Sequence, residues 1–113
     1  MNYDLEERTA KFGESIINFI KILPRNNINN PLISQLVRSA TSIGANYMEA
    51  NQASSKKDFR NKIHIFCRKE SNETKHWLRM MATNNSEKKD VVKKLWQEAH
   101  ESTLIFAKIS KSC

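Results

Sequence analysis

The chain has 113 residues, of which 39% are hydrophobic and 27% are charged, the composition of a folded domain rather than of a disordered segment. Lysine and arginine outnumber aspartate and glutamate by 19 to 12, so the net charge is +7 and an anionic partner is favoured: nucleic acid, an acidic protein or a membrane surface. Two glycines and two prolines are too few for a turn-rich β-fold, so we predict one all-α domain over residues 1–113. A solvated basic surface without a partner is the alternative interpretation of the charge.

The first predicted helix covers residues 5–23. Asp4 and Glu7 have the spacing of a capping box at its start, and Pro24 with the asparagine-rich stretch that follows ends it. One side of this helix carries the residues that we expect in the core: Leu5, Thr9, Phe12, Ile16, Phe19, Ile20 and Leu23.

The second predicted helix covers residues 31–53, with Asn30 as its N-cap and Pro31 at its first position. Its core side holds Leu36, Val37, Ala40, Ile43, Gly44 and Tyr47. The opposite side is built from small and mildly polar residues, which let another backbone come close. We therefore predict an oligomer interface there, formed by Arg38, Ser42, Ala45 and Glu49, in which Arg38 and Glu49 each pair with a neighbouring subunit. A small-residue surface in contact with water is the alternative.

The third predicted helix covers residues 56–82, and Ser55 with Asp58 forms a second capping box at its start. Its hydrophobic side is expected to hold Phe59, Ile63, Phe66, Thr74, Trp77 and Met81.

Two glutamates, Glu70 and Glu73, lie on this same hydrophobic side. Burying a carboxylate is costly unless it is paired and hydrogen-bonded. We expect these carboxylates to meet a cation, Arg38 or Arg8, or to lie at the rim of the core. Together with Asn46 they form a predicted structural polar network.

The fourth predicted helix covers residues 87–110 and is capped by Ser86. Its hydrophobic side holds Val92, Leu95, Ala99, Phe106 and Ile109. Short joints between four long helices make consecutive helices antiparallel neighbours. The sequence therefore predicts an antiparallel up-down-up-down four-helix bundle.

Basic residues lie opposite the hydrophobic sides of the third and fourth predicted helices, where they suit phosphate contacts that bind without reading base sequence. The residues that we expect to contact RNA or DNA are Lys56, Lys57, Arg60, Lys89, Lys93, Lys94 and Lys108. The rival function is a protein-interaction scaffold whose basic side docks an acidic partner.

Catalytic patterns are weak. Glu73 and His76 form one copy of the Glu-x-x-His pattern of di-iron bundles, which need two copies and further glutamates. Cys67, three residues after His64, is expected in the core, and Cys113 is expected to be a free thiol. The sequence contains no phosphate-binding loop and no nucleophile elbow. We expect no enzyme activity, no metal and no cofactor.

The sequence also predicts the cellular location of the protein. The first residues, MNYDLEERTAKF, carry acids where a signal peptide has a basic segment, and no hydrophobic run approaches the roughly 18 residues of a membrane span. We expect a cytoplasmic protein without a membrane partner.

Three stretches, QLVRSATSIGANYMEA, SKKDFRNKIHI and RKESNETKHWLRMM, resemble the bacterial four-helix-bundle proteins encoded in intervening sequences of large-subunit ribosomal RNA genes, some of which carry a ribosomal-protein name. The resemblance extends from about residue 3 to residue 81, and the fourth helix is the variable part. It rests on the following residues: Arg38, Ser42, Ile43, Asn46, Glu49, Asp58, Phe59, Lys69, Glu70, Glu73, Thr74, Trp77 and Leu78.

This resemblance implies an antiparallel four-helix bundle that assembles into a ring, a homopentamer. More distant relatives are accessory proteins of diversity-generating retroelements, which are basic pentameric barrels that bind nucleic acid and a reverse transcriptase. The resemblance therefore implies self-association, and it adds a reverse transcriptase to the acidic protein as a partner of the scaffold alternative.

Overall fold

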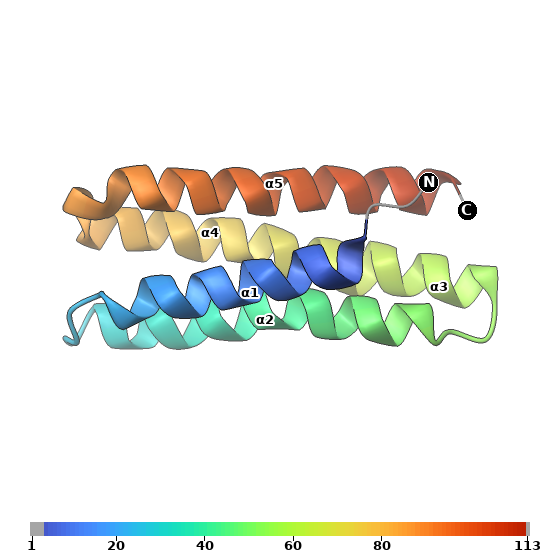
Figure 1. The fold of residues 1–113 in the computed structure, drawn as a ribbon, viewed down its shortest axis with the longest axis horizontal. Helices are drawn as coiled ribbons and strands as arrows, with labels where there is room; N and C mark the ends of the chain where they lie inside the picture. The colour runs from blue at the N-terminus through green and yellow to red at the C-terminus, as the bar shows by residue number, and fades with distance from the viewer. Residues whose placement is uncertain (1–3, 113) are drawn as a thin grey trace.

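The structure, a computed structural model, describes residues 4–112, and the side chains of residues 4–111; Cys113 lies outside this range. It contains these elements: α1 (Leu5–Lys21), α2 (Asn29–Asn51), α3 (Lys56–Lys62), the π-helical turn η1 (Ile63–Cys67), α4 (Arg68–Asn84), the short 3₁₀ turn η2 (Ser86–Lys88) and α5 (Lys89–Ser112). Since α3, η1 and α4 follow one another without a break, they form a single rod. The described chain is an antiparallel four-helix bundle of 45 × 21 × 19 Å (Figure 1).

The core lies where the hydrophobic spacing predicts it. Every residue predicted for the hydrophobic side of α1 is buried. Leu36, Ala40 and Ile43 of α2 are buried beneath α1 and α4, and Val92 and Phe106 of α5 are buried on the opposite side of the core. Figure 1 shows the resulting pairs, with α1 beside α2 and α4 beside α5.

Of the four predicted helix caps, Asn30 and Ser86 are wrong, Ser55 is confirmed, and Asp4 is at the N-cap position of α1 without the expected side-chain bond. The Asp4 side chain makes no capping hydrogen bond, and its backbone adopts the left-handed conformation with φ of 48°. Asn26 takes the role that was predicted for Asn30. Its side-chain oxygen accepts a hydrogen bond from the backbone N–H of Asn29, the first residue of α2, at 2.7 Å. Ser86 caps nothing and instead opens the short turn η2. The cap at Ser55 is confirmed, since its hydroxyl accepts from Asp58 N at 3.0 Å.

Two asparagines that were expected in loops are fully buried and hold one end of the bundle together. Asn29 Nδ2 donates to Asn85 Oδ1 at 3.0 Å, and Asn85 Nδ2 donates back to Asn29 Oδ1 at 2.9 Å. Further bonds reach the carbonyl oxygens of Pro24 and Met81. The joint between α1 and α2 is thus fastened to the joint between α4 and α5.

The π-turn η1 explains one wrong assignment in the third rod. The prediction placed Phe66 on the hydrophobic side, three residues after Ile63, but the Phe66 side chain is 46% exposed. A π-turn contains an extra residue, so the position one turn after Ile63 is Cys67 instead. Both Ile63 and Cys67 are completely buried. The expected burial of Cys67 is confirmed.

Candidate nucleic-acid interface

The positive charge is concentrated in the second half of the chain. Residues 1–53 contain five basic and five acidic residues, whereas residues 54–113 contain 14 basic and seven acidic residues. The whole net charge of +7 therefore belongs to the rod α3–η1–α4 and to α5. Among the described residues, these two rods therefore carry the surface that attracts anions.

A groove of about 460 Å³ runs between α4 and α5. Cations flank it from both helices: Arg79 from α4, and Lys89 and Lys93 from α5. Its floor is hydrophobic, with Ala82 and Val92 among the lining residues. A hydrophobic floor between cations fits a ligand that has both flat apolar surfaces and phosphates.

One aromatic ring, Trp96, lines the end of this groove. His100 stacks on the indole, with ring centroids 5.0 Å apart and planes 17° apart. Lys75 Nζ lies 5.3 Å from the centre of the same ring and 3.1 Å from His100 Nδ1. Since a charged lysine only donates, Nδ1 is the acceptor and the imidazole proton is on Nε2. Trp96 is therefore a half-buried aromatic surface set among cations.

The predicted phosphate contacts do not form one patch. Lys89 and Lys93 lie at the α4–α5 groove, whereas Lys94 lines a different cavity beside α1, together with Arg8 and Glu98. Lys56, Lys57 and Arg60 open the third rod at the opposite end of the bundle, where Lys108 lies near the end of α5 (Figure 1). All seven predicted residues are exposed.

Trp96, Lys75 and Arg79 were missed as parts of one site. The signal was present in α5, where Lys89, Lys93, Trp96 and His100 follow one another at intervals of four, three and four residues. Such spacing places all four on one side of a helix. The contribution of Lys75 and Arg79 depends on how α4 packs beside α5, and the sequence alone does not give that.

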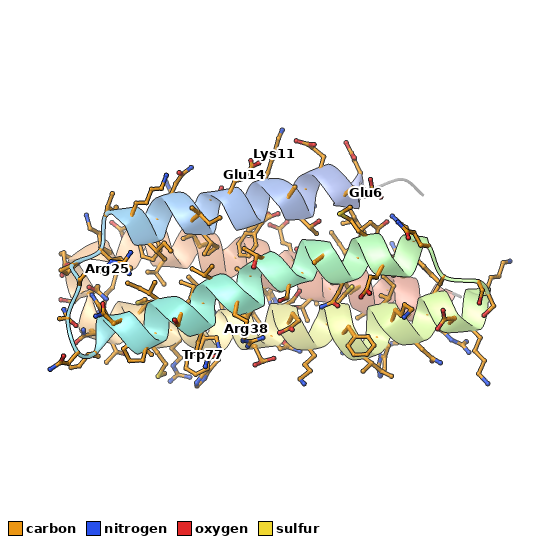
Figure 2. The ribbon with its side chains drawn as sticks, turned by 90° about the horizontal axis from the view of Figure 1, so that it is seen from below. Glu6, Lys11, Glu14, Arg25, Arg38 and Trp77 are labelled. Carbon is orange, nitrogen blue, oxygen red and sulfur yellow. The ribbon has the colours of Figure 1, made fainter. Side chains whose placement is uncertain are left out.

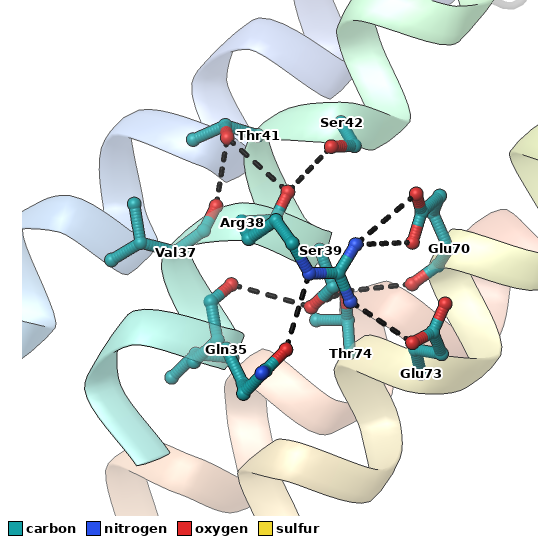
Figure 3. Close-up of polar contacts among 10 residues, drawn as sticks. Gln35, Val37, Arg38, Ser39, Thr41, Ser42, Glu70, Glu73 and Thr74 are labelled. Atoms are coloured by element: carbon teal, nitrogen blue, oxygen red, sulfur yellow. Dashed lines mark hydrogen bonds and ion pairs between the residues drawn. The ribbon is translucent and has the colours of Figure 1, made fainter. Parts of the chain in front are cut away.

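The two glutamates of α4 meet Arg38 of α2 (Figure 3). Arg38 Nη1 lies 3.2 Å from Glu70 Oε1, and Nη2 lies 2.9 Å from Glu73 Oε1. Of the two cations expected for these carboxylates, Arg38 is thus the partner, while Arg8 binds Glu98 at 2.7 Å. Arg38 finds its carboxylates inside its own chain.

This cluster is strained electrostatically at Glu70. Burial, reinforced by the neighbouring Glu73 carboxyl, raises the pKa of Glu70 above its ordinary value, and Arg38 acts in the opposite direction. Directly beneath the ion pairs, the hydroxyls of Thr74 and Ser39 are hydrogen-bonded at 2.9 Å. The cluster therefore joins α2 to α4 through one shared cation. Asn46, the third member of the predicted network, takes no part in it among the described side chains and is half-buried.

The other predicted interface residues lie on the side of α2 that faces away from the core. Ala45 and Glu49 are exposed, and the Ser42 hydroxyl donates to the Arg38 carbonyl oxygen at 2.6 Å. Figure 2 looks onto this side, with Lys11 and Glu14 pointing outward from α1 and Arg38 at the edge of α2 that faces α4.

Between α1 and α2 lies a groove of about 300 Å³ whose walls are mostly small or hydrophobic. Ala45 lines it, and Met48 beside it is 55% exposed. Ile17, across the groove on α1, is 38% exposed. The other small residues that line this groove are Ala10, Gly13 and Gly44.

Residues with chemical reactivity are placed as follows. Burial raises the pKa of the Cys67 thiol to about 12, which makes it a poor nucleophile. Among the described residues, no group of three or more histidines, cysteines, aspartates or glutamates is arranged to hold a metal ion. No helix in residues 4–112 is long and hydrophobic enough to cross a membrane.

Comparison with known proteins places the chain beside a protein family and a solved structure. A family model described as 23S rRNA-intervening sequence protein matches residues 1–110. A crystal structure from Bacteroides thetaiotaomicron, of a protein with unknown function from the S23 ribosomal protein family, has 31% sequence identity with this chain and a TM-score of 0.80. That match covers 94% of this chain and 97% of the other. No match is found among curated proteins.

Proposed function

The chain belongs to the 23S rRNA-intervening sequence protein family, and on that premise we propose that it is a cytoplasmic, non-enzymatic helical bundle that self-associates and binds RNA or DNA. The binding surface is the groove between α4 and α5. Binding there uses phosphate contacts and base stacking and does not read base sequence.

The observation that carries this proposal is the position of Trp96. Proteins that bind single strands without sequence preference combine cations that contact the phosphates with aromatic rings on which bases stack. The groove offers both, since Trp96 lines it with Arg79, Lys89 and Lys93 and Lys75 lies over the ring. An acidic protein would also be attracted by the cations, but it has no need of an aromatic ring among them. A single strand is therefore favoured over an acidic partner, and over duplex DNA.

Self-association is the second part of the proposal. Its support is the small-residue groove between α1 and α2, where Ile17 and Met48 expose hydrophobic surface. A ring of five copies is the assembly that the sequence resemblance implies. With α1 and α2 facing a neighbour, the α4–α5 groove stays on the outside of each copy.

Fluorescence titration tests the nucleic-acid proposal directly, because the chain has two tryptophans. We expect a single-stranded RNA of mixed sequence to quench the emission of a Trp77→Phe variant, in which Trp96 remains, and to leave a Trp96→Phe variant almost unquenched. The logarithm of the affinity should fall linearly with the logarithm of the salt concentration, with a slope of about −0.7 for each phosphate contacted.

Two results would count against this function. One is the absence of binding to RNA and DNA at low salt; the other is equal quenching of both tryptophan variants. In the first case, recovery of one specific protein from a nuclease-treated extract would point to the scaffold function, with an acidic protein or a reverse transcriptase as the partner.

A further inference from the structure

A second cavity, of about 450 Å³, lies at the other end of the bundle from the Asn29–Asn85 pair. It is formed where the start of the third rod packs against the last turns of α5, so its walls come from segments that are far apart in the sequence. The basic side chains that line it are Arg60, His64, Arg68 and Lys111, and Asn61 and Ser110 are the other polar lining residues. None of the described residues that line this cavity is acidic.

Two of the three cations that line this cavity are not balanced by a carboxylate among the described residues. Within the described part of the chain, neither Arg68 nor Lys111 forms an ion pair with a carboxylate. The cavity beside α1 is different, because there Arg8 is paired with Glu98 at 2.7 Å. Converging cations without acids attract an anion and hold it more firmly than scattered surface lysines.

The guanidinium of Arg68 is the most specific feature. Its Nη1 lies 3.0 Å from His64 Nδ1, so Nδ1 accepts and the ring proton of His64 is on Nε2. Its Nε–H is buried and has no acceptor in the structure. Leaving a buried donor unpaired costs free energy, and an anion that supplies the acceptor recovers it. The side chain is half-exposed, which leaves it room to turn from His64 toward a ligand.

The π-turn η1 forms part of the wall of this cavity. His64 lies within η1 and Arg68 directly follows it, and their side chains are in contact. π-turns cost helix geometry and occur frequently at functional sites. Here the turn also directs Cys67 into the core, so both the cavity wall and the core depend on it.

We propose that this cavity binds a phosphate monoester of about nucleotide size. A monoester has a charge of about −1.5 to −2 at neutral pH and three acceptor oxygens, which suits several converging cations better than the single charge of a backbone phosphodiester. The volume is in the range of small-molecule pockets and exceeds what one phosphate group fills. The ligand is either a free nucleotide or the phosphorylated 5′ end of a nucleic acid. This site is separate from the α4–α5 groove and does not depend on it.

Calorimetry with two matched pairs of ligands tests the proposal and separates the two sources. The first pair is adenosine 5′-monophosphate and adenosine, and the second is one RNA oligonucleotide with a 5′-phosphate or a 5′-hydroxyl. We expect the phosphorylated member of at least one pair to bind at least about tenfold more tightly than its partner. A preference in the first pair identifies a free nucleotide, and a preference in the second pair alone identifies a nucleic-acid end. Equal affinity within both pairs would overturn the proposal.

Variants then locate the site. Arg68→Gln removes the guanidinium, and we expect it to abolish the preference for the phosphorylated ligand. Arg79→Gln removes the same charge from the α4–α5 groove and should leave that preference within about twofold, because it does not line this cavity. Lys111→Gln, on the last turn of α5, is a second variant that does not disturb the core, and we expect it to weaken the preference. Equal effects of Arg68→Gln and Arg79→Gln would show general charge attraction and refute a specific pocket.

A spectroscopic signal distinguishes ligand contact from a structural role of Arg68. When a phosphate draws the guanidinium away, His64 loses its donor, and the NMR signal of its Nδ1 should move during a titration with adenosine 5′-monophosphate or, for a nucleic-acid end, with the 5′-phosphorylated oligonucleotide. The same titration of Arg68→Gln should leave the His64 signal in place. A shift of equal size in both proteins would place the ligand elsewhere.

Discussion

The groove between α1 and α2 and the groove between α4 and α5 are built on equivalent pairs of antiparallel helices, yet they differ in chemistry. The first is lined by alanine and glycine with Ile17 and Met48 exposed, and its charged lining residues are the acids Glu6 and Glu14. The second has a tryptophan and three cations, in the half that carries the whole net charge. A small-residue surface whose lining charges are acidic repels a nucleic acid and suits another helix. A cationic aromatic surface suits a nucleic acid.

The difference shows how one bundle can use one pair of helices, α1 and α2, for assembly and the other pair, α4 and α5, for ligand binding. Small residues allow close approach of a helix, and close approach buries the hydrophobic area that association requires. Lysines resist such burial because each must lose its hydration. The two functions proposed here therefore need not compete for the same surface, and substitutions on one side should leave the other function intact.

The largest expected effect comes from Ala45→Arg, which places a long charged side chain in the α1–α2 groove. We expect the particle mass to fall several-fold, to that of a 13.1 kDa monomer, because the charge cannot be buried against a second copy. Arginine is a good helix former and Ala45 is exposed, so the helix content should not change. Light scattering and circular dichroism measure these two quantities.

Two controls accompany this substitution. Ala45→Ser keeps a small residue and should keep the parent mass, and Asn72→Arg adds the same charge to an exposed position of α4. If Ala45→Arg has the mass of the parent protein, the α1–α2 groove is not the association surface. RNA binding by the Ala45→Arg monomer should persist, since Trp96 is on the other helix pair.

The next effect, on the α4–α5 side, compares Trp96→Leu with Lys93→Gln. Loss of one base stack costs about 1–3 kcal/mol, so Trp96→Leu should weaken binding of single-stranded RNA by about tenfold without changing the salt slope. Lys93→Gln should instead reduce the slope by about 0.7, since one phosphate contact is lost. Fluorescence polarisation over a range of salt concentrations separates them. A changed slope in Trp96→Leu, or an unchanged slope in Lys93→Gln, would contradict this division of roles.

The sequence was sufficient for the bundle, because helical spacing of hydrophobic residues reports burial directly. It identified the hydrophobic side of α1 completely. It failed where the signal is three-dimensional. Phe66 was misplaced because no local pattern announces a π-turn, and the buried Asn29–Asn85 pair was missed because its partners are 56 positions apart.

The candidate sites follow the same rule. Lys89 and Lys93 were found because they stand on one helix, whereas the Arg68 cavity needs the packing of the third rod against α5. The sequence predicted Arg38 both at an interface with a neighbouring subunit and, with Arg8 as the alternative, as a partner of Glu70 and Glu73. Only the register between α2 and α4 shows that Arg38, and not Arg8, pairs with these two glutamates within the chain.

A smaller effect is expected at the seam between the neutral and the charged half, where Arg38 of α2 meets Glu70 and Glu73 of α4. Arg38→Met should lower the free energy of unfolding at pH 7 by about 1 kcal/mol, a modest value because the arginine side chain is 45% exposed. The remaining two carboxylates then repel each other without a shared cation.

The pH dependence of this variant has a definite sign. The pKa of Glu70 is already raised in the folded protein, and loss of Arg38 raises it further, because the arginine is a cause that lowers it. A raised folded pKa favours folding below the unfolded pKa, and this contribution disappears as the pH rises through the folded pKa. The deficit of Arg38→Met should therefore shrink between pH 7 and pH 5 in urea denaturation. A deficit of equal size at both pH values would contradict this. Adding Glu70→Gln to Arg38→Met should remove most of the stability deficit.

The smallest effects separate two reasons for glycine in the α1–α2 groove. At Gly13 an added Cβ would lie 3.8 Å from Thr41 Cγ2, an ordinary contact, so Gly13→Ala should raise the free energy of unfolding of the monomer by about 0.5–1 kcal/mol through helix propensity alone. At Gly44 it would lie 3.2 Å from Thr9 Oγ1. That hydroxyl is held by a bond to the Leu5 carbonyl oxygen at 2.6 Å and cannot easily move, so Gly44→Ala should gain nothing or lose stability.

The comparison is best made in the Ala45→Arg background, where urea denaturation reports the monomer alone. When Gly13→Ala is the single substitution, its added Cβ fills part of the α1–α2 groove. This variant should therefore also associate more weakly than the parent protein. Stabilisation without weaker association would mean that Gly13 leaves no space that a second copy uses. In that case, the close packing of α1 on α2 within one chain still explains the glycine at position 44. The glycine at position 13 would need another explanation.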